Sequence, residues 1–311
     1  MPRIAEYLPL MAVITKGIED EFSARTVPGV IDAVRTMYSM IETHDTRVDA
    51  FTARATEWLI QNSGTDSWDA RRVSRYAKEL ENEISGEKLR QAWACGDCAD
   101  LISDLENESV RLVLTDPPYG VKYQSNHRRK PHNVIAGDNS VDEAMDVLSA
   151  MLTAIEPKLE ADAHLMIFCS WRTEHRVRAV VQSTGYSVRG SYIWDKQAAT
   201  AGDLNGTLGS SHERIVHAVK GKPLVYERDR DVLPYARVPT DRHPTEKPVP
   251  LLKRLIETMT ARRDLVVDPF GGVASTLVAA KECGRGYWGC EFDERFHAIG
   301  GQRLAATGEG D

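Results

Sequence analysis

From about residue 90 onward, short apolar runs alternate with stretches in which apolar residues recur at helical spacing. The first pattern predicts buried strands and the second predicts amphipathic helices. The expected strands are QAWAC, RLVLT, HLMIFCSW, VRGSYIWDK, SHERIVHAVKG, RDLVVD and GYWGCE. The expected helices are VDEAMDVLSAMLTAIEPKL, RVRAVVQSTGY, TEKPVPLLKRLIETMT and STLVAAKECG. This alternation predicts an α/β fold in which a mostly parallel sheet is flanked by helices.

The N-terminal part of the chain has a different texture, because it is rich in helix-forming residues and poor in glycine. Apolar positions that mark one face of an amphipathic helix there are Val73, Tyr76, Leu80 and Ile84. We therefore predict an N-terminal helical extension of unknown role over residues 1–88 and a second domain over residues 89–311.

Composition places the chain among ordinary globular proteins, since 42% of its 311 residues are hydrophobic and 27% are charged. No apolar run approaches the roughly 20 residues that span a bilayer. The apolar patch near the N-terminus is followed by acids and lacks a signal-peptide cleavage site. We therefore expect a cytoplasmic protein with no membrane partner, in which the five cysteines are reduced thiols.

Cys95 and Cys98 form a CxxC pair, which raises the question of a metal site. A four-thiolate zinc site needs a second closely spaced pair, and Cys283 and Cys290 are farther apart with no flanking ligand pattern. We therefore expect small packed thiols and no bound metal.

The stretch LTDPPYG at residues 114–120 follows an apolar run and ends the predicted strand. Proline lacks a backbone donor and fixes φ, so two prolines in succession stop a strand and stiffen its exit. The result is a rigid ledge that carries the Asp116 carboxylate and the Tyr119 ring. Ligands of open α/β sheets bind at the carboxyl ends of the strands, where this ledge lies. An ordinary strand-to-turn exit is the alternative reading of this stretch alone.

A second turn, DLVVDPFGGVASTLVAAKECG, joins a strand to a helix through Gly271 and Gly272. Tight glycine turns let a ligand approach the backbone, and helix N-termini favour anionic groups. Glu291 lies 19 residues after Gly272, at the end of the next predicted strand. An acid in that place can accept hydrogen bonds from ribose hydroxyls, so the pattern indicates an adenosine-containing cofactor. The phosphate-loop pattern GxxxxGK[ST] and the dinucleotide pattern GxGxxG are absent.

A cluster of positive residues directly follows the DPPYG turn and consists of Lys122, Arg128, Arg129 and Lys130. The net charge of -7 does not by itself indicate a nucleic-acid binder. Binding depends on where cations gather, however, and this cluster stands beside the ledge. A solvated loop and a DNA-binding loop both stay open.

Four motifs in a fixed order resemble the beta class of DNA amino-methyltransferases. LTDPPYG resembles their catalytic motif, DPFGG with the glutamate at the end of the next strand resembles their S-adenosylmethionine site, and HPTEKP at 243–248 resembles the segment before their cofactor-site helix. GDCADLISDL is similar to an upstream segment of that class, and the matches span about residues 93–300. The family's glycine turn usually has a second glycine where this chain has Ala274. The resemblance implies a Rossmann-like methyltransferase fold with a circularly permuted motif order.

The resemblance also implies the site residues. The catalytic residues would be Asp116, Pro117, Pro118 and Tyr119. The residues that bind S-adenosyl-L-methionine would be Asp97, Cys98, His243, Lys247, Asp268, Pro269, Phe270, Gly271, Gly272, Ser275, Thr276 and Glu291. Among them, Asp97 would contact the adenine of the cofactor, and His243 and Lys247 would lie near its amino-acid end.

The implied reaction is methyl transfer to the exocyclic amine of a base flipped out of double-stranded DNA. An Asp at the first position of the catalytic motif favours adenine N6, and cytosine N4 is the alternative. Cytosine-C5 methylation needs a Pro-Cys nucleophile, and this sequence has no Pro-Cys dipeptide. A methyltransferase acting on RNA or a protein amide, and a catalytically weak DNA-binding regulator, are the remaining alternatives.

The target sequence in DNA cannot be read from these residues. We expect target recognition to lie in the variable segments at about 122–140 and 197–242, in which we recognise no pattern that specifies a DNA sequence. A homodimer and a separate restriction enzyme are both compatible with the chain, and neither is indicated by a motif.

Overall fold

A computed structural model describes residues 89–120, 140–199, 208–238 and 245–308. It also describes the single residues Arg75, Lys78, Glu79, Asn82, Gly206 and Arg242. The predicted helical extension therefore lies almost wholly outside the described residues. So do His243 and the basic cluster of Lys122, Arg128, Arg129 and Lys130.

The chain divides into two compact units, and the larger consists of residues 89–223, 228–260 and 264–311. The fold and the site below belong to this larger unit. None of the helices in the described ranges combines the length and apolar character needed to cross a membrane.

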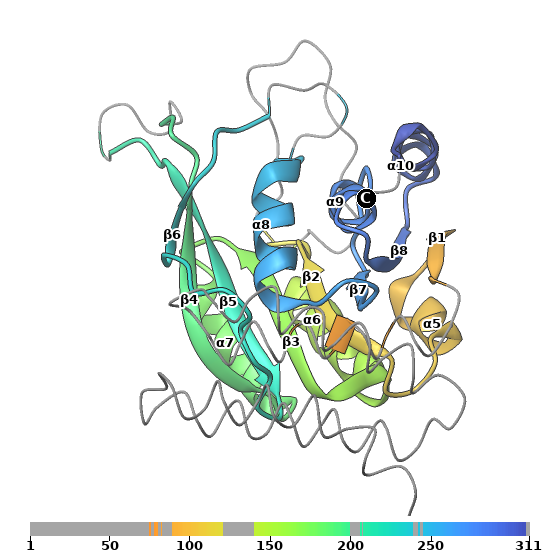
Figure 1. The fold of residues 1–311 in the computed structure, drawn as a ribbon. Helices are drawn as coiled ribbons and strands as arrows, with labels where there is room; N and C mark the ends of the chain where they lie inside the picture. Colours follow the sequence, from red (N-terminus) through yellow and green to blue (C-terminus); the bar gives the residue numbers. More distant parts are fainter. Residues whose placement is uncertain are drawn as a thin grey trace, which may run out of the picture. The chain divides into compact units, whose positions relative to one another are not determined.

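Within the described residues, eight strands form one sheet in the order β1-β8-β7-β2-β3-β5-β4-β6 (Figure 1). The strands are β1 (Gln91–Cys95), β2 (Val110–Thr115), β3 (Leu159–Cys169), β4 (Ser187–Asp195), β5 (His212–Lys220), β6 (Val232–Pro234), β7 (Leu265–Asp268) and β8 (Gly286–Glu291). All seven strands expected from the apolar pattern are present. β6 was not predicted, because three residues are too few to show an alternation.

The sheet is mostly parallel, as predicted. β1, β8, β7, β2 and β3 pair in parallel. β5 runs antiparallel to both β3 and β4, whereas β4 and β6 pair in parallel. The strand that leads to DPPYG therefore lies in the middle of the sheet, beside the strand that leads to the glycine turn.

Helices flank this sheet (Figure 1). They are α5 (Cys98–Leu101), α6 (Val141–Ile155), α7 (Glu174–Ser183), α8 (Val249–Met259), α9 (Ser275–Glu282) and α10 (Glu294–Ala306), with short 3-10 turns at Ile102–Asp104 and Glu156–Lys158. α6 packs beside α7, and α9 packs against α8 and α10. The helix predicted from the sequence continued into EPKL. The observed α6 ends at Ile155, and a 3-10 turn follows because Pro157 lacks a backbone donor.

The centre of the sheet is buried on both faces. Val113 of β2 belongs to the core cluster that contains the apolar face of α6. Its neighbours Leu112 and Leu114 are fully buried as well, and alternation along the strand turns them to the opposite face. Burial on both faces explains why the strand reads as the continuous run VRLVL rather than as an alternating pattern.

The parallel pairing brings the carboxyl ends of five strands to one edge of the sheet. The residues that end these strands are Cys95, Glu291, Asp268, Thr115 and Cys169. Both motifs that the sequence singled out begin at this edge, because DPPYG continues β2 and DPFGG continues β7. The fold therefore places the ledge and the glycine turn side by side.

Candidate active site

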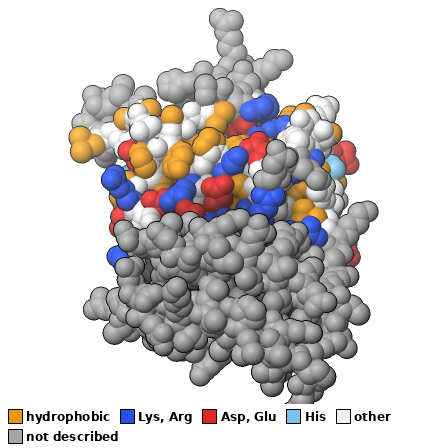
Figure 2. Space-filling view, in the orientation of Figure 1, with side chains coloured by type: hydrophobic (Ala, Val, Ile, Leu, Met, Phe, Trp, Pro, Cys, Tyr) orange, Lys and Arg blue, Asp and Glu red, His pale blue; other side chains and the backbone are white. Residues whose placement is uncertain are grey.

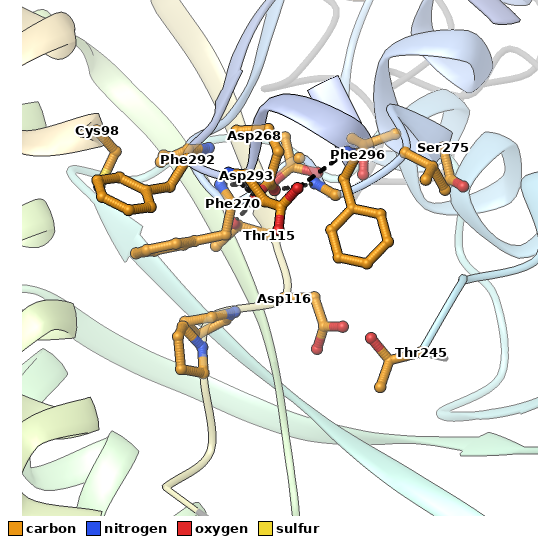
Figure 3. Close-up of a pocket in the computed structure, with 18 of the residues that line it drawn as sticks. Cys98, Thr115, Asp116, Thr245, Asp268, Phe270, Ser275, Phe292, Asp293 and Phe296 are labelled. Atoms are coloured by element: carbon orange, nitrogen blue, oxygen red, sulfur yellow. Dashed lines mark hydrogen bonds between the residues drawn. The ribbon is translucent and has the colours of Figure 1, made fainter. Parts of the chain in front are cut away.

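A cavity of about 760 Å³ opens at this edge of the sheet (Figure 3). Its volume falls within the ~300–1,000 Å³ typical of sites for small molecules and cofactors. Of the residues that the sequence assigned to catalysis or to the cofactor, those that line it are Asp97, Cys98, Asp116, Pro117, Pro118, Tyr119, Lys247, Asp268, Pro269, Phe270, Gly271, Gly272, Ser275, Thr276 and Glu291. The structure thus brings together every such residue that it describes.

The ledge after β2 is stabilised by hydrogen bonds from side chains. Thr115, the last residue of β2, donates to Asp268 over 2.7 Å and so links the ends of two neighbouring strands. The Tyr119 hydroxyl donates to Asp116 and also lies 3.4 Å from Glu213 Oε2. Burial and the neighbouring Asp116 raise the pKa of Tyr119 well above its ordinary value, so the phenol keeps its proton and acts as a donor.

Lys247 contacts the ledge directly, because its ammonium is paired with the Asp116 carboxylate. The same ammonium lies 3.3 Å from Glu213 Oε2. The resemblance placed Lys247 near the amino-acid end of the cofactor, whereas its ion-pair partners in the described structure are these two carboxylates. Both hydrogen-bonding oxygens of Asp116 are therefore engaged, Oδ1 by Tyr119 and Oδ2 by Lys247.

The glycine turn after β7 is anchored at both ends. Asp268 is buried, and burial raises its pKa to about 6 while hydrogen bonds from Thr276 and Thr115 oppose the rise. Gly271 donates its backbone N–H to the carbonyl of Cys290 on β8 over 2.8 Å. The turn is thus fixed to the two strands that flank it, which leaves its inner surface facing the cavity.

Glu291 holds the second half of this turn. One carboxylate oxygen accepts from the Gly272 N–H and the other from the Asp293 N–H, each over 2.8 Å. Burial raises the pKa of Glu291 despite these two donors. A carboxylate oxygen has a second lone pair, so both oxygens can still accept a hydrogen bond from a ligand in the cavity.

Aromatic side chains border the cavity (Figure 3). They are Phe270, Phe292 and Phe296, and Phe292 is 63% exposed. An exposed phenylalanine next to a cavity offers a flat apolar surface to a ligand. Phe292 and Phe296 were not predicted as site residues, although the stretch FDERF directly follows the predicted site acid Glu291.

Ala274 adopts the left-handed conformation, with φ 61° and ψ 30°, at the N-cap of α9. For a residue with a Cβ this conformation costs roughly 1–2 kcal/mol. The family's usual glycine there would adopt it freely. Ala274 is also fully buried, so its methyl group packs in the core rather than reaching into the cavity.

No group of three His, Cys, Asp or Glu side chains that could hold a metal ion occurs among the described residues. Cys98 is buried in the cavity wall, and burial raises the pKa of its thiol to about 12. Both cysteines of the CxxC pair are free thiols.

Gly271 gives a stability test of the turn. A Cβ at this position would lie 2.5 Å from the Trp93 ring, which is held by a hydrogen bond to His297 over 2.9 Å. Gly271→Ala should therefore lower the free energy of unfolding by about 1–3 kcal/mol, the usual effect of overpacking. Urea unfolding measures this change. Gly308→Ala is the matched control, because a Cβ there meets nothing within 4 Å, and an equal effect of both variants would contradict the packing described.

The family model for N6/N4 methyltransferases, described as DNA methylase, matches residues 110–301. The chain belongs to this DNA methylase family. The match begins at the first residue of β2 and ends within α10, so it includes the ledge and the glycine turn. It stops short of β1 and Asp97.

Individual members resemble the chain over similar lengths. A putative methylase of Escherichia coli K12, YubD, is 35% identical over 213 residues, which make up 68% of this chain and 89% of that protein. The complex of M1.HpyAVI with SAM has a TM-score of 0.55 at 20% identity, covering 68% of this chain and 98% of that one. The PvuII DNA methyltransferase, described as cytosine-N4-specific, has a TM-score of 0.58 at 18% identity, covering 70% and 89%. The two structural matches establish the Rossmann-like methyltransferase fold predicted above.

Proposed function

We propose that this protein transfers a methyl group from S-adenosylmethionine to the exocyclic amine of a base in double-stranded DNA, and that the base is adenine, methylated at N6. The observation that carries the proposal is one cavity lined by both the Asp-Pro-Pro-Tyr ledge and the glycine turn with its acid. Membership of the DNA methylase family supports it. The SAM complex of the similar M1.HpyAVI supports the choice of cofactor.

The cofactor fits one side of the cavity. S-adenosylmethionine supplies an activated methyl group on a sulfonium when bound. Glu291 and Asp97 offer carboxylates to its hydroxyl and amino groups, and the exposed Phe292 offers an apolar face to its adenine. The backbone of the glycine turn permits a close approach.

The ledge would prepare the amine. An exocyclic amine is a poor nucleophile, because its lone pair is delocalised into the base. The Asp116 carboxylate and the Pro117 carbonyl can accept hydrogen bonds from the two N–H groups of the amine. These hydrogen bonds favour a tetrahedral nitrogen and free its lone pair for the methyl group. Tyr119 provides a ring on which a flipped base can stack. Holding the amine in line with the methyl group then supplies much of the rate.

The base produced tests this assignment. Mass spectrometry of nucleosides from DNA methylated by the purified protein should find N6-methyladenine. N4-methylcytosine would keep the enzyme class and overturn the choice of base, for which the similar PvuII enzyme is a precedent. Faster methylation of RNA than of duplex DNA would overturn the choice of substrate. Absence of turnover would overturn the proposed activity and favour the alternative of a catalytically weak DNA-binding regulator, for which Ala274 in place of the family's usual glycine is the support.

DNA contacts are proposed for the basic cluster, which lies outside the described residues. On the described part of the face in Figure 2, basic side chains lie among acidic ones, so that surface offers mixed charge to a phosphate backbone. The segments 122–140 and 197–242 would carry target recognition. Residues 1–88 would form a separate helical extension, and the protein would act in the cytoplasm.

The salt dependence of DNA binding tests the basic cluster. Replacing Arg128, Arg129 and Lys130 together with Ala should reduce the slope of log affinity against log salt by about two to three, since each phosphate contact contributes nearly one. Titrations at several salt concentrations measure the slope. The charge-matched control replaces three lysines at the opposite edge of the sheet, Lys158, Lys220 and Lys222. An unchanged slope in the first triple variant would show that the cluster is only a solvated loop.

A further inference from the structure

Glu213 is a second carboxylate at the ledge, and the sequence gives no sign of it. It lies at the start of β5, which runs antiparallel to β3. Because of that direction, the beginning of β5 reaches the edge at which β2 and β3 end. Its side chain is 17% exposed, and that of Lys247 is 6% exposed.

The two oxygens of Glu213 have different partners. Oε1 lies 2.6 Å from the ammonium of Lys196, which follows the end of β4. Oε2 lies 3.3 Å from the Lys247 ammonium and 3.4 Å from the Tyr119 hydroxyl. These are the same two donors that occupy Asp116. One oxygen of Glu213 is therefore an alternative acceptor for both groups that now engage Asp116.

An amine substrate gives this alternative a use. Each oxygen of Asp116 has a second lone pair, so a target amine can share the carboxylate with Lys247 and Tyr119, and it is bound more strongly when Lys247 turns to another acceptor. A buried ammonium without an acceptor would be costly. Lys247 is enclosed by aromatic rings, with the Phe168 centroid 5.0 Å and the Trp194 centroid 5.9 Å from its nitrogen. The rings restrict where it can go, and Glu213 Oε2 is within reach.

The charges balance in the resting cluster. Asp116 and Glu213 supply two negative charges, and Lys247 and Lys196 supply two positive charges. Burial raises the pKa of Asp116 and Lys247 opposes that rise. For Glu213, burial is outweighed by the two lysines, which hold its pKa below the ordinary value. Two other groups among the described residues face Asp116. They are Asp268 at the end of β7 and Cys169 at the end of β3, and the thiol of Cys169 stays neutral because burial raises its pKa to about 12.

We propose that Lys247 and Glu213 are positioning residues for methyl transfer: Glu213 receives the Lys247 ammonium when the target amine binds Asp116, so that Lys247 stays paired and close enough to Asp116 to keep it ionised. The inference rests on the proposed function and adds to it an exchange of partners. Glu213 is the alternative acceptor for the Lys247 ammonium, and the ion pair with Lys196 fixes the position of the Glu213 carboxylate. The methyl-transfer chemistry itself is unchanged by this exchange.

The pH dependence of kcat distinguishes this role from simple support of the fold. Activity needs ionised Asp116, so it falls as the pH drops through the pKa of that group. Lys247→Gln removes the opposing cation and should move this acidic limb up by roughly one to three pH units, with activity recovering at higher pH. Lys247→Arg keeps the charge and should restore the limb. Glu213→Gln removes a like charge and should move the limb down, while kcat falls by about tenfold because Lys247 no longer leaves Asp116 readily.

A matched pair of variants and a second measurement complete the test. Lys253→Gln and Glu282→Gln alter a half-buried lysine–glutamate pair outside the cavity lining, 3.1 Å apart, and should leave the limb in place. Carboxyl NMR titration of Asp116 reports the same coupling without turnover, and it separates Asp116 from Asp268. The proposal would be overturned if Lys247→Gln and Glu213→Gln both kept the acidic limb of kcat and the Asp116 titration of the wild type.

Two further outcomes are informative. A weaker affinity of Lys247→Gln for S-adenosylmethionine, with an unmoved Asp116 titration, would return Lys247 to the cofactor and overturn the exchange. A wild-type protein without methyl transfer, in which the Asp116 titration still moves in opposite directions in the two variants, would reject the proposed function and uphold the charge coupling.

Discussion

Replacing Asp116 with Ala should lower the rate of methyl transfer to DNA by about a hundredfold or more, with S-adenosylmethionine bound as in the wild type. In the proposed mechanism the carboxylate accepts a hydrogen bond from the amine as positive charge develops on the nitrogen, and loss of a charge-assisted hydrogen bond in the transition state has this scale of effect. The hydrogen bonds described for the glycine turn involve Thr115, Cys290 and Glu291 rather than Asp116, so the affinity for the cofactor should stay unchanged.

Single-turnover kinetics with labelled cofactor measures the first quantity, and calorimetry measures the second. Asp116→Asn is the companion variant, because it keeps the shape of the side chain and one acceptor oxygen. Asp142→Ala is the matched control, since that carboxylate is 82% exposed and pairs with Arg176 on the surface. Turnover of Asp116→Ala within about threefold of the wild type would remove Asp116 from the mechanism.

Glu291→Ala should weaken S-adenosylmethionine binding by about 2 kcal/mol, close to thirtyfold in Kd. The substitution removes a carboxylate from the cavity and also frees the backbone N–H groups of Gly272 and Asp293. The turn then loses its shape as well as its acceptor. Glu291→Gln keeps one carbonyl acceptor and should cause a smaller loss.

Calorimetric titration of the apo protein with S-adenosylmethionine gives this value without any DNA. Glu106→Ala is the control, because Glu106 is exposed and lies away from the cavity lining. Unchanged affinity in Glu291→Ala would show that the glycine turn does not bind the cofactor.

The two motifs could be found from the sequence because their chemistry is local. Pro117 and Pro118 stop β2 wherever it lies, and Gly271 and Gly272 mark a turn between a strand and a helix in any α/β protein. The rule that parallel strands share an edge then places both motifs together. The position of Glu291 relative to Gly272 follows from the same rule.

Glu213 and Lys196 could not be found in this way. The apolar run of β5 does not reveal its direction, and only the antiparallel pairing with β3 brings Glu213 to the site edge. Its pairing with β4 sets Glu213 opposite Trp194, two residues before Lys196. The ion-pair partners of Lys247 could not be predicted for a similar reason, because a motif identifies a residue but not the groups that it contacts.

The most direct test of the account is to express the protein in a host whose DNA lacks amino-methylated bases and to analyse the nucleosides of that DNA. We expect N6-methyladenine at a defined sequence in the DNA of cells that express the wild-type protein. The modified base should be absent from cells that express Asp116→Ala at the same level. DNA without any methylated amino group, from cells that contain soluble wild-type protein, would contradict the central claim.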